Sequence, residues 1–99
     1  MTRRIRWTNT AVERLAEIEE YIEQDSPQGA SNFLVEVIEL VETLSEHANR
    51  GRHLPELWAE SIRELIYGNF RVVYRVRPKE VEILTVFEGH RLLRDDEFE

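Results

Sequence analysis

Arginine and histidine are the residues of this sequence best suited to chemistry on a phosphodiester. Breaking such a bond beside a ribose hydroxyl requires activation of that hydroxyl, stabilisation of the charge developing at phosphorus, and protonation of the leaving oxygen. Arg63 and Arg71 would hold the phosphate in such a site. His90 would act as acid or base beside an electrostatic clamp from Arg91. The default interpretation of His90 is a loop histidine without a catalytic role, because spacing alone does not establish the geometry of a general acid or base.

The residue types and their spacing predict neither thiol chemistry nor a metal site. The sequence contains no cysteine, which excludes disulfides, thiolate zinc sites and thiol nucleophiles. Its histidines, His47, His53 and His90, fit no standard ligand spacing. We therefore expect neither a metal nor a cofactor.

Length and composition favour one domain that spans residues 1–99. With 99 residues, 41% of them hydrophobic and 9% aromatic, the chain can build a single core. The 13 basic and 20 acidic residues leave a net charge of −7, which disfavours a general nucleic-acid coat. No apolar signal segment follows the first arginines, and no run approaches a membrane span. We expect a cytoplasmic protein with no membrane partner.

The elements that must position these side chains begin with a short strand over residues 3–7. A helix is expected from about Thr8 to Gln24, capped by Thr8 or by Thr10. Its apolar residues repeat at helical spacing, at Ala11, Leu15, Ile18 and Ile22. Ser26 and Pro27 begin a second helix, and the short connection makes the pair an antiparallel hairpin.

The second helix has a broader apolar surface than the first. Its main stripe is Ala30, Leu34, Val37, Val41 and Leu44, with Phe33, Ile38 and Leu40 beside it. A helix with this pattern buries more than a narrow seam, so we expect it to lie between the first helix and another element. The aromatic residues expected in the core are Trp7, Tyr21, Phe33, Phe70 and Tyr74.

The second half of the chain has the period of two that is typical of strands. After a loop over residues 49–55, strands are expected at 62–67, 70–77 and 81–87, which form an antiparallel meander. Gly51 and Gly68 are expected to adopt positive φ. The fold class is therefore α+β, with an N-terminal strand and a helical hairpin packed on a mainly antiparallel sheet.

Alternation along the strands assigns side chains to two faces of the sheet. In the middle strand, the side expected to meet the helices carries Phe70, Val72, Tyr74 and Val76. The other side, expected to be partly cationic, carries Arg71, Val73, Arg75 and Arg77. In the preceding strand, one side carries Ile62, Glu64 and Ile66, and the other carries Arg63, Leu65 and Tyr67.

Two features of the loop before the meander bear on binding. Arg52 and Glu56 are expected to pair with each other or with strand arginines, which would only hold the loop in place. Trp58 is interpreted as a rim aromatic that anchors a partner.

The net charge conceals a segregation along the sequence. Residues 1–7 carry a charge of +3, residues 8–48 carry −9, residues 49–94 carry +3 and residues 95–99 carry −4. An acidic helical hairpin is thus expected to be backed by a mildly basic sheet, to which an acidic partner would dock.

The order of these segments resembles the RelE/ParE superfamily of bacterial toxins, and most closely its ParE-like branch of plasmid stabilization proteins. The resemblance covers essentially the whole chain. Its fragments are Trp7-Thr8-x-x-Ala11, Leu15-x-x-Ile18-x-x-Tyr21-Ile22, Ser26-Pro27-x-x-Ala30, Gly51-Arg52-x-x-Pro55-Glu56, Ile62-Arg63-Glu64-Leu65, Phe70-Arg71-Val72-Val73-Tyr74-Arg75-Val76, and Val81-x-Ile83-Leu84-x-Val86 with Gly89-x-Arg91 after it.

The resemblance implies a toxin that a small cognate antitoxin neutralises, in a toxin–antitoxin hetero-oligomer. The superfamily includes DNA gyrase inhibitors and ribosome-dependent mRNA endoribonucleases, so the fold does not decide the target. For a gyrase inhibitor no catalytic residue is required, and the target-binding residues would be Arg63, Arg71, Arg75, Arg91 and Arg94.

The sequence departs from the nuclease branch at two places. The cationic series of that branch along the first meander strand is largely missing, with Glu64 at its centre, and Glu88 stands where the branch commonly has histidine. We therefore expect a gyrase inhibitor. The alternatives are an endoribonuclease that uses Arg63, Arg71, His90 and Arg91 on ribosome-bound mRNA, and a degenerate toxin that retains only antitoxin binding.

Overall fold

The computed structural model describes residues 2–54 and 61–89. Its elements are β1 (Arg4–Trp7), α1 (Asn9–Asp25), α2 (Pro27–Glu42), the 3-10 turn η1 (Thr43–Ser45), β2 (Arg52–His53), β3 (Ile62–Tyr67), β4 (Phe70–Val76) and β5 (Glu80–Glu88). The predicted strands and helices are all present, with ends displaced by one residue at most where an end was predicted. Only β2 was missed, because it consists of two residues inside the predicted loop.

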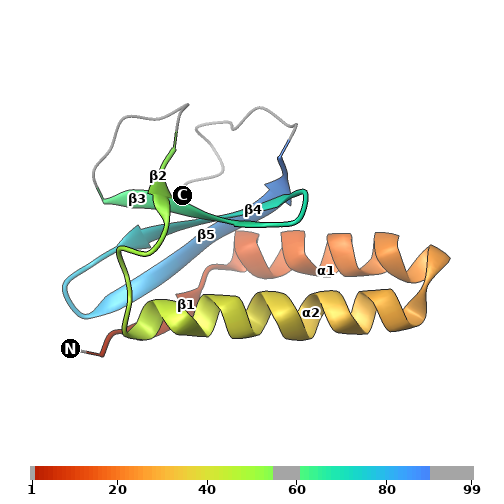
Figure 1. Ribbon diagram of the computed structural model, residues 1–99, viewed down its shortest axis with the longest axis horizontal. Coiled ribbons are helices and arrows are strands. Elements are labelled where there is room, and N and C mark those ends of the chain that lie inside the picture. Colours follow the sequence, from red (N-terminus) through yellow and green to blue (C-terminus); the bar gives the residue numbers. More distant parts are fainter. Residues whose placement is uncertain (1, 55–60, 90–99) are drawn as a thin grey trace.

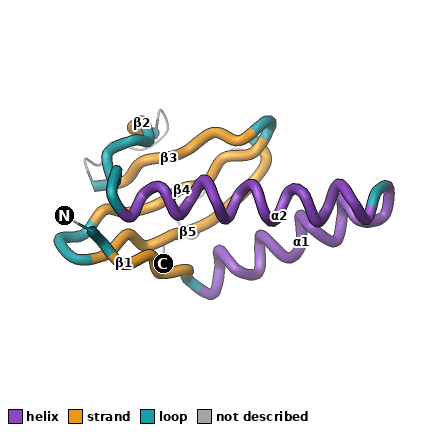
Figure 2. Tube along the Cα trace, turned by 60° about the horizontal axis from the view of Figure 1, so that its bottom comes forward, coloured by secondary structure: helices purple, strands orange, loops and turns teal. Residues whose placement is uncertain are grey.

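The strands form one sheet in the order β1-β5-β4-β3-β2. β1 runs parallel to β5, and every other neighbouring pair is antiparallel. The helical hairpin of α1 and α2 covers one face of this sheet (Figures 1 and 2). The α+β fold expected from the sequence is confirmed.

Side-chain caps fix where both helices begin. The Thr8 hydroxyl oxygen accepts a hydrogen bond from Ala11 N at 3.1 Å and lies 2.8 Å from Ile83 O, so it ties the start of α1 to β5. Of the two predicted caps for α1, Thr8 is therefore the one used. Ser26 caps α2 by accepting from Gly29 N at 2.9 Å, and Pro27 occupies the first helical position as predicted.

The main core lies between the hairpin and the sheet. Phe33 on α2 makes edge-to-face contacts with Tyr67 and Phe70, with ring centroids 6.1 and 5.1 Å apart. Val72 and Tyr74 of β4 are fully buried in this core, and Phe70 and Val76 pack against it. The predicted helix-facing side of the middle strand is therefore confirmed.

Two residues expected to contribute to packing lie at the surface instead. Tyr21 is 68% exposed and Ile38 is 42% exposed. Each is one residue from an inward-facing neighbour, Ile22 or Val37, and one residue turns an α-helix by about 100°. No third layer covers that side of the hairpin among the described residues, so these side chains face outward.

The face of the sheet away from the helices has a second, smaller core. It consists of the buried side chains of Leu54, Ile62, Val73, Leu84 and Phe87. The register between β4 and β5 shifts beside this core, because Val73 pairs with Thr85 whereas Tyr74 pairs with Ile83. The face predicted to be partly cationic is thus apolar at its centre, with charged side chains around that centre.

Candidate functional site

A buried carboxylate organises one side of the second sheet face. Glu64 on β3 is 1% exposed and forms ion pairs with Arg71 on β4 and with Arg52 on β2, the latter at 2.7 Å. Arg71 is itself only 6% exposed, and its guanidinium lies 5.0 Å above the ring centre of Phe87. Arg71 is therefore a neutralised cation packed into the sheet, although the sequence placed it on an accessible face.

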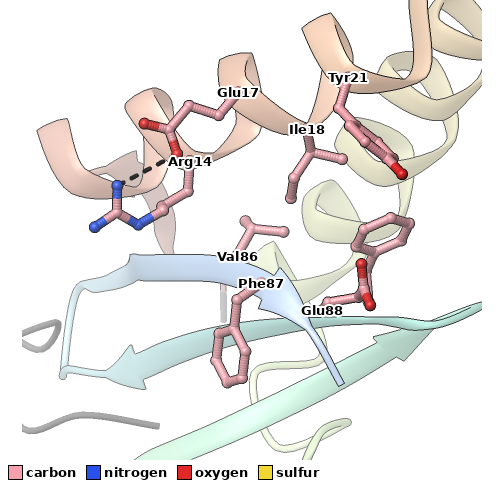
Figure 3. Close-up of a pocket in the computed structure, with 8 residues that line it drawn as sticks. Arg14, Glu17, Ile18, Tyr21, Val86, Phe87 and Glu88 are labelled. Carbon is pink, nitrogen blue, oxygen red and sulfur yellow. Dashed lines mark hydrogen bonds and ion pairs between the residues drawn. The ribbon is translucent and has the colours of Figure 1, made fainter. Parts of the chain in front are cut away.

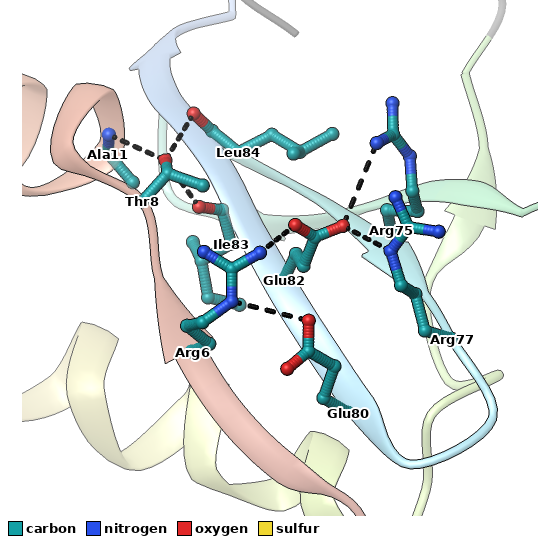
Figure 4. A network of polar contacts seen from close by, with 9 residues as sticks. All are labelled: Arg6, Thr8, Ala11, Arg75, Arg77, Glu80, Glu82, Ile83 and Leu84. Atoms are coloured by element: carbon teal, nitrogen blue, oxygen red, sulfur yellow. Dashed lines mark hydrogen bonds and ion pairs between the residues drawn. The ribbon is translucent and has the colours of Figure 1, made fainter. Parts of the chain in front are cut away.

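A second carboxylate organises the other side of this face, across β1, β5 and β4 (Figure 4). Glu82 forms ion pairs with Arg6, with Arg77 at 2.7 Å and with Arg75 at 3.6 Å. Burial raises the pKa of Glu82, but the hydrogen bond and charge of Arg77 and the charges of Arg6 and Arg75 outweigh it, so the pKa lies below its ordinary value. The predicted target-binding residue Arg75 is thus also paired.

Arg63 lies on the opposite face from Arg71. It alternates with Glu64 along β3 and is paired in register with Tyr74, on the side that the helices cover. Its Nη1 donates to Gly51 O at 2.7 Å, so it holds the segment before β2. Arg63 and Arg71, predicted to bind one phosphate together, are therefore not brought together by the fold.

Gly51 sits where two parts of the chain approach closely. Its amide donates to the Tyr74 hydroxyl at 2.8 Å, and that hydroxyl donates to Ala48 O at 2.8 Å. Gly68 is the only described residue with a positive φ, so the expectation for Gly51 was wrong and that for Gly68 was right. Gly51 is required by space, because a Cβ there would lie 2.5 Å from both Glu64 O and the Tyr74 hydroxyl oxygen.

A groove of about 250 Å³ opens between α1 and the ends of β4 and β5 (Figure 3). It is lined by Arg14, Glu17, Ile18, Tyr21, Phe70, Val86, Phe87 and Glu88. Arg14 and Glu17 form an ion pair at 3.5 Å on its helical wall. The groove therefore combines an apolar floor with charged walls, and exposed Tyr21 stands on its rim.

The most conspicuous residue missed by sequence reasoning is Glu64. The resemblance made it a departure from a cationic series, and only its position between Ile62 and Ile66 on one strand face indicated a buried acid. Arg52 pairs with this glutamate, whereas its predicted partner Glu56 lies outside the described residues.

Several predicted site residues lie outside the described part of the chain. These are Glu56, Trp58, His90, Arg91 and Arg94. Within residues 2–54 and 61–89, no three His, Asp or Glu side chains converge on a possible metal position. Over the same ranges, no helix has the length and apolar character needed to cross a membrane.

A five-stranded sheet with one parallel edge strand and a helical hairpin on one face defines the RelE/ParE-like class of α+β domains. Residues 5–93 match the family of the ParE toxin of the type II toxin–antitoxin system parDE. The chain is also 38% identical over 91 residues to "Putative toxin Y4kP" of Sinorhizobium fredii, a match that covers 90% of this chain and 91% of that protein. The chain belongs to the ParE toxin family of type II toxin–antitoxin systems.

Solved structures agree with this assignment. The chromosomal ParDE toxin–antitoxin system from P. aeruginosa matches with a TM-score of 0.74 and 26% identity, over 88% of this chain and 96% of that one. The toxin–antitoxin complex RelBE2 from Mycobacterium tuberculosis matches with a TM-score of 0.62 and 23% identity, over 89% of this chain and 92% of that one. The second likeness concerns the fold alone.

Proposed function

We propose that this toxin acts by occupying a protein surface, and that its target is DNA gyrase. The observation that carries the proposal is the burial of Arg71 against Glu64. A nuclease of this fold would need cations free to stabilise a developing phosphorane. Here a carboxylate with no exposed side-chain surface already neutralises the arginine closest to that role.

The position of Arg63 supports the same proposal. Because Arg63 and Arg71 lie on opposite faces of the sheet, they do not bind one phosphate in the described arrangement. A surface inhibitor has no such requirement, because its contacts can be spread over several elements. Arg75, Arg91 and Arg94 remain proposed contacts of the target.

The antitoxin is the second proposed partner. Both structural relatives are described as toxin–antitoxin assemblies. We place the antitoxin in the groove beside α1, where an apolar segment would cover Ile18 and Phe70 and pack on Tyr21. A basic residue of that segment would complement Glu17 and Glu88 at the walls.

The test measures two activities of the purified toxin in parallel. Gyrase supercoiling of relaxed plasmid is followed with increasing toxin, and the integrity of mRNA is followed in a reconstituted translation reaction at the same concentrations. Loss of supercoiling with intact mRNA is the expected result. Toxin neutralised by its antitoxin serves as the control in both reactions.

Other outcomes would contradict the gyrase proposal. Ribosome-dependent cleavage of mRNA, abolished in a folded His90→Ala variant that still binds antitoxin, would establish the endoribonuclease alternative. Binding of antitoxin with neither activity would establish a degenerate toxin.

A further inference from the structure

The cations of the described residues divide into two groups by their partners. Six of them form ion pairs with carboxylates: Arg6, Arg14, Arg52, Arg71, Arg75 and Arg77. The other cations have no carboxylate within ion-pair distance among the described residues, and we call them the basic pole: Arg3, Arg4, Arg50, Arg63 and Lys79.

The five members of the basic pole lie at one end of the molecule. Arg3 and Arg4 stand at the start of β1, and Lys79 stands in the turn that begins β5. Arg63 is the second residue of β3, whose start lies beside the end of β4. Arg50 lies in the loop between η1 and β2. In Figure 1 this is the end that holds the N-terminus and the turn between β4 and β5.

Neutral oxygens orient three of these guanidinium groups without cancelling their charge. Arg3 Nε donates to Arg77 O at 2.9 Å, and Arg50 Nη1 donates to the Thr43 hydroxyl at 2.8 Å. Arg63 Nη1 donates to Gly51 O at 2.7 Å. Each arginine has five N–H donors, so each retains several for a ligand.

The immediate surroundings of the basic pole are positive overall. Arg3 and Arg50 line a hollow together with His47 and one acid, Glu46. Glu80, which stands opposite Arg4 in the register of β1 and β5, pairs with Arg6 at 3.2 Å. The negative end of the α2 dipole would account for the position of Arg50. It would not account for Arg4 and Lys79, because these residues come from the sheet.

The apolar surface of the molecule lies elsewhere. The large hydrophobic side chains exposed among the described residues are Val12, Tyr21, Val35, Ile38 and Ile66. None lies in the segments that carry Arg3, Arg4, Arg50 and Lys79, namely the start of β1, the loop after η1 and the turn before β5. A protein-binding surface, by contrast, relies on apolar and aromatic anchors at its centre. Binding of a phosphodiester backbone requires spread cations and no such anchor.

We propose that the basic pole binds the phosphodiester backbone of a nucleic acid, without reading its sequence. The overall charge of −7 does not prevent this, because most of the acids lie in residues 8–48 and 95–99, whereas residues 1–7 and 49–94 are each positive overall. The proposal goes beyond gyrase inhibition and does not depend on it. With gyrase as the target, the pole would contact the DNA that the enzyme holds.

The experiment is fluorescence anisotropy of labelled duplex DNA titrated with the full-length toxin alone, at several salt concentrations. Duplex RNA of the same length forms a second arm. The variants are Arg4→Gln, Arg50→Gln and Lys79→Gln, chosen because all three side chains are exposed. Arg14→Gln is the matched control, with the same change in charge at an arginine paired with Glu17 on α1.

We expect salt-dependent binding that each pole substitution weakens severalfold, with the slope of log K against log salt reduced in magnitude by about 1. The Arg14→Gln control should bind like the parent. Binding of RNA but not DNA would support the pole as a phosphodiester site and contradict gyrase as its context.

The proposal would be overturned by absence of binding at low salt, or by equal losses in the pole variants and the control. It would also be overturned if a poly-glutamate peptide bound as tightly as DNA with the same dependence on Arg50, because the pole would then be a site for acidic protein segments. None of these readouts requires gyrase, so a failure here is distinguishable from failure of the gyrase proposal.

Discussion

The hydroxyl of Tyr74 joins two segments far apart in the sequence, by accepting from Gly51 N and donating to Ala48 O at 2.8 Å each. Tyr74 is fully buried at the centre of β4. Burial raises the pKa of its hydroxyl above the ordinary value, against the opposing effects of the Gly51 amide and the charges of Arg63 and Arg50. A single core side chain thus holds the segment between η1 and β2 on the sheet.

Tyr74→Phe removes both hydrogen bonds of the hydroxyl with little change in the shape of the side chain. The Gly51 amide loses its buried acceptor, so we expect the free energy of unfolding to fall by about 1–3 kcal/mol. Urea denaturation followed by tryptophan fluorescence measures the change. An effect below about 0.5 kcal/mol would mean that water replaces the hydroxyl.

Gly51→Ala tests the close approach at the same junction. The new Cβ would meet Glu64 O and the Tyr74 hydroxyl at 2.5 Å, and the carbonyl belongs to the backbone of β3. We expect a loss of about 1–3 kcal/mol of stability from overpacking, which a Tyr74→Phe background does not restore. Full rescue in that background would show that the side chain alone limits the space.

Glu64 pairs with one buried arginine, Arg71, and one exposed arginine, Arg52, so the contributions of these two arginines to stability can be compared. Arg71→Gln leaves Glu64 buried beside a weaker donor, and we expect a loss of about 3–5 kcal/mol of stability. Arg52→Gln should cost only about 0–1 kcal/mol, because the Arg52 side chain is 63% exposed. Thermal or urea unfolding of both variants distinguishes them, and equal losses would be inconsistent with the described burial.

Glu82 should make stability depend on acid pH. Its pKa in the folded state lies below the unfolded value, so its contribution is present above about pH 4.3 and is lost as pH falls through the folded pKa. The difference in unfolding free energy between the parent and Glu82→Gln should therefore be largest near neutral pH and shrink below about pH 4.3. A difference that grows in acid would contradict the role of Arg77, Arg6 and Arg75.

A substitution at Tyr21 should affect antitoxin binding without affecting the stability of the fold. Because its side chain is 68% exposed, Tyr21→Ala should change the free energy of unfolding by less than about 0.5 kcal/mol. Its position on the groove rim predicts at least a tenfold loss of antitoxin affinity in calorimetry, about 1.4 kcal/mol. Val35→Ala, at an apolar residue of α2 that is 53% exposed and lies outside the groove, is the control and should bind antitoxin normally.

The periodicity of the sequence was sufficient to predict most of the architecture. Steps of three and four residues gave the two helices, and alternation gave β4 with the correct side chains toward the hairpin and divided the β3 residues correctly between the two faces. These features are local, since they depend on which side of one element is apolar. Caps such as Ser26 before Pro27 are local as well, because the donor lies three residues away.

The candidate site was predictable only in part, because charge pairing joins residues that are distant in sequence. Glu64 and Arg71 are seven residues apart, but they lie on adjacent strands of the hairpin formed by β3 and β4. Arg6 pairs with Glu82 only because β1 lies beside β5. The sequence supplied the arginines as a group. It did not indicate which of them a carboxylate neutralises.

By itself, the sequence determined the family, the α+β class and the side of the middle strand that meets the helices, since hydrophobic period and motif order carry that information. Only the tertiary structure decided that Arg63 and Arg71 lie on opposite faces and that Arg71 is buried. It alone gathered the cations without carboxylate partners, among the described residues, at one end of the sheet. The physical reason is that electrostatic environment depends on strand order and register, which are set by long-range pairing.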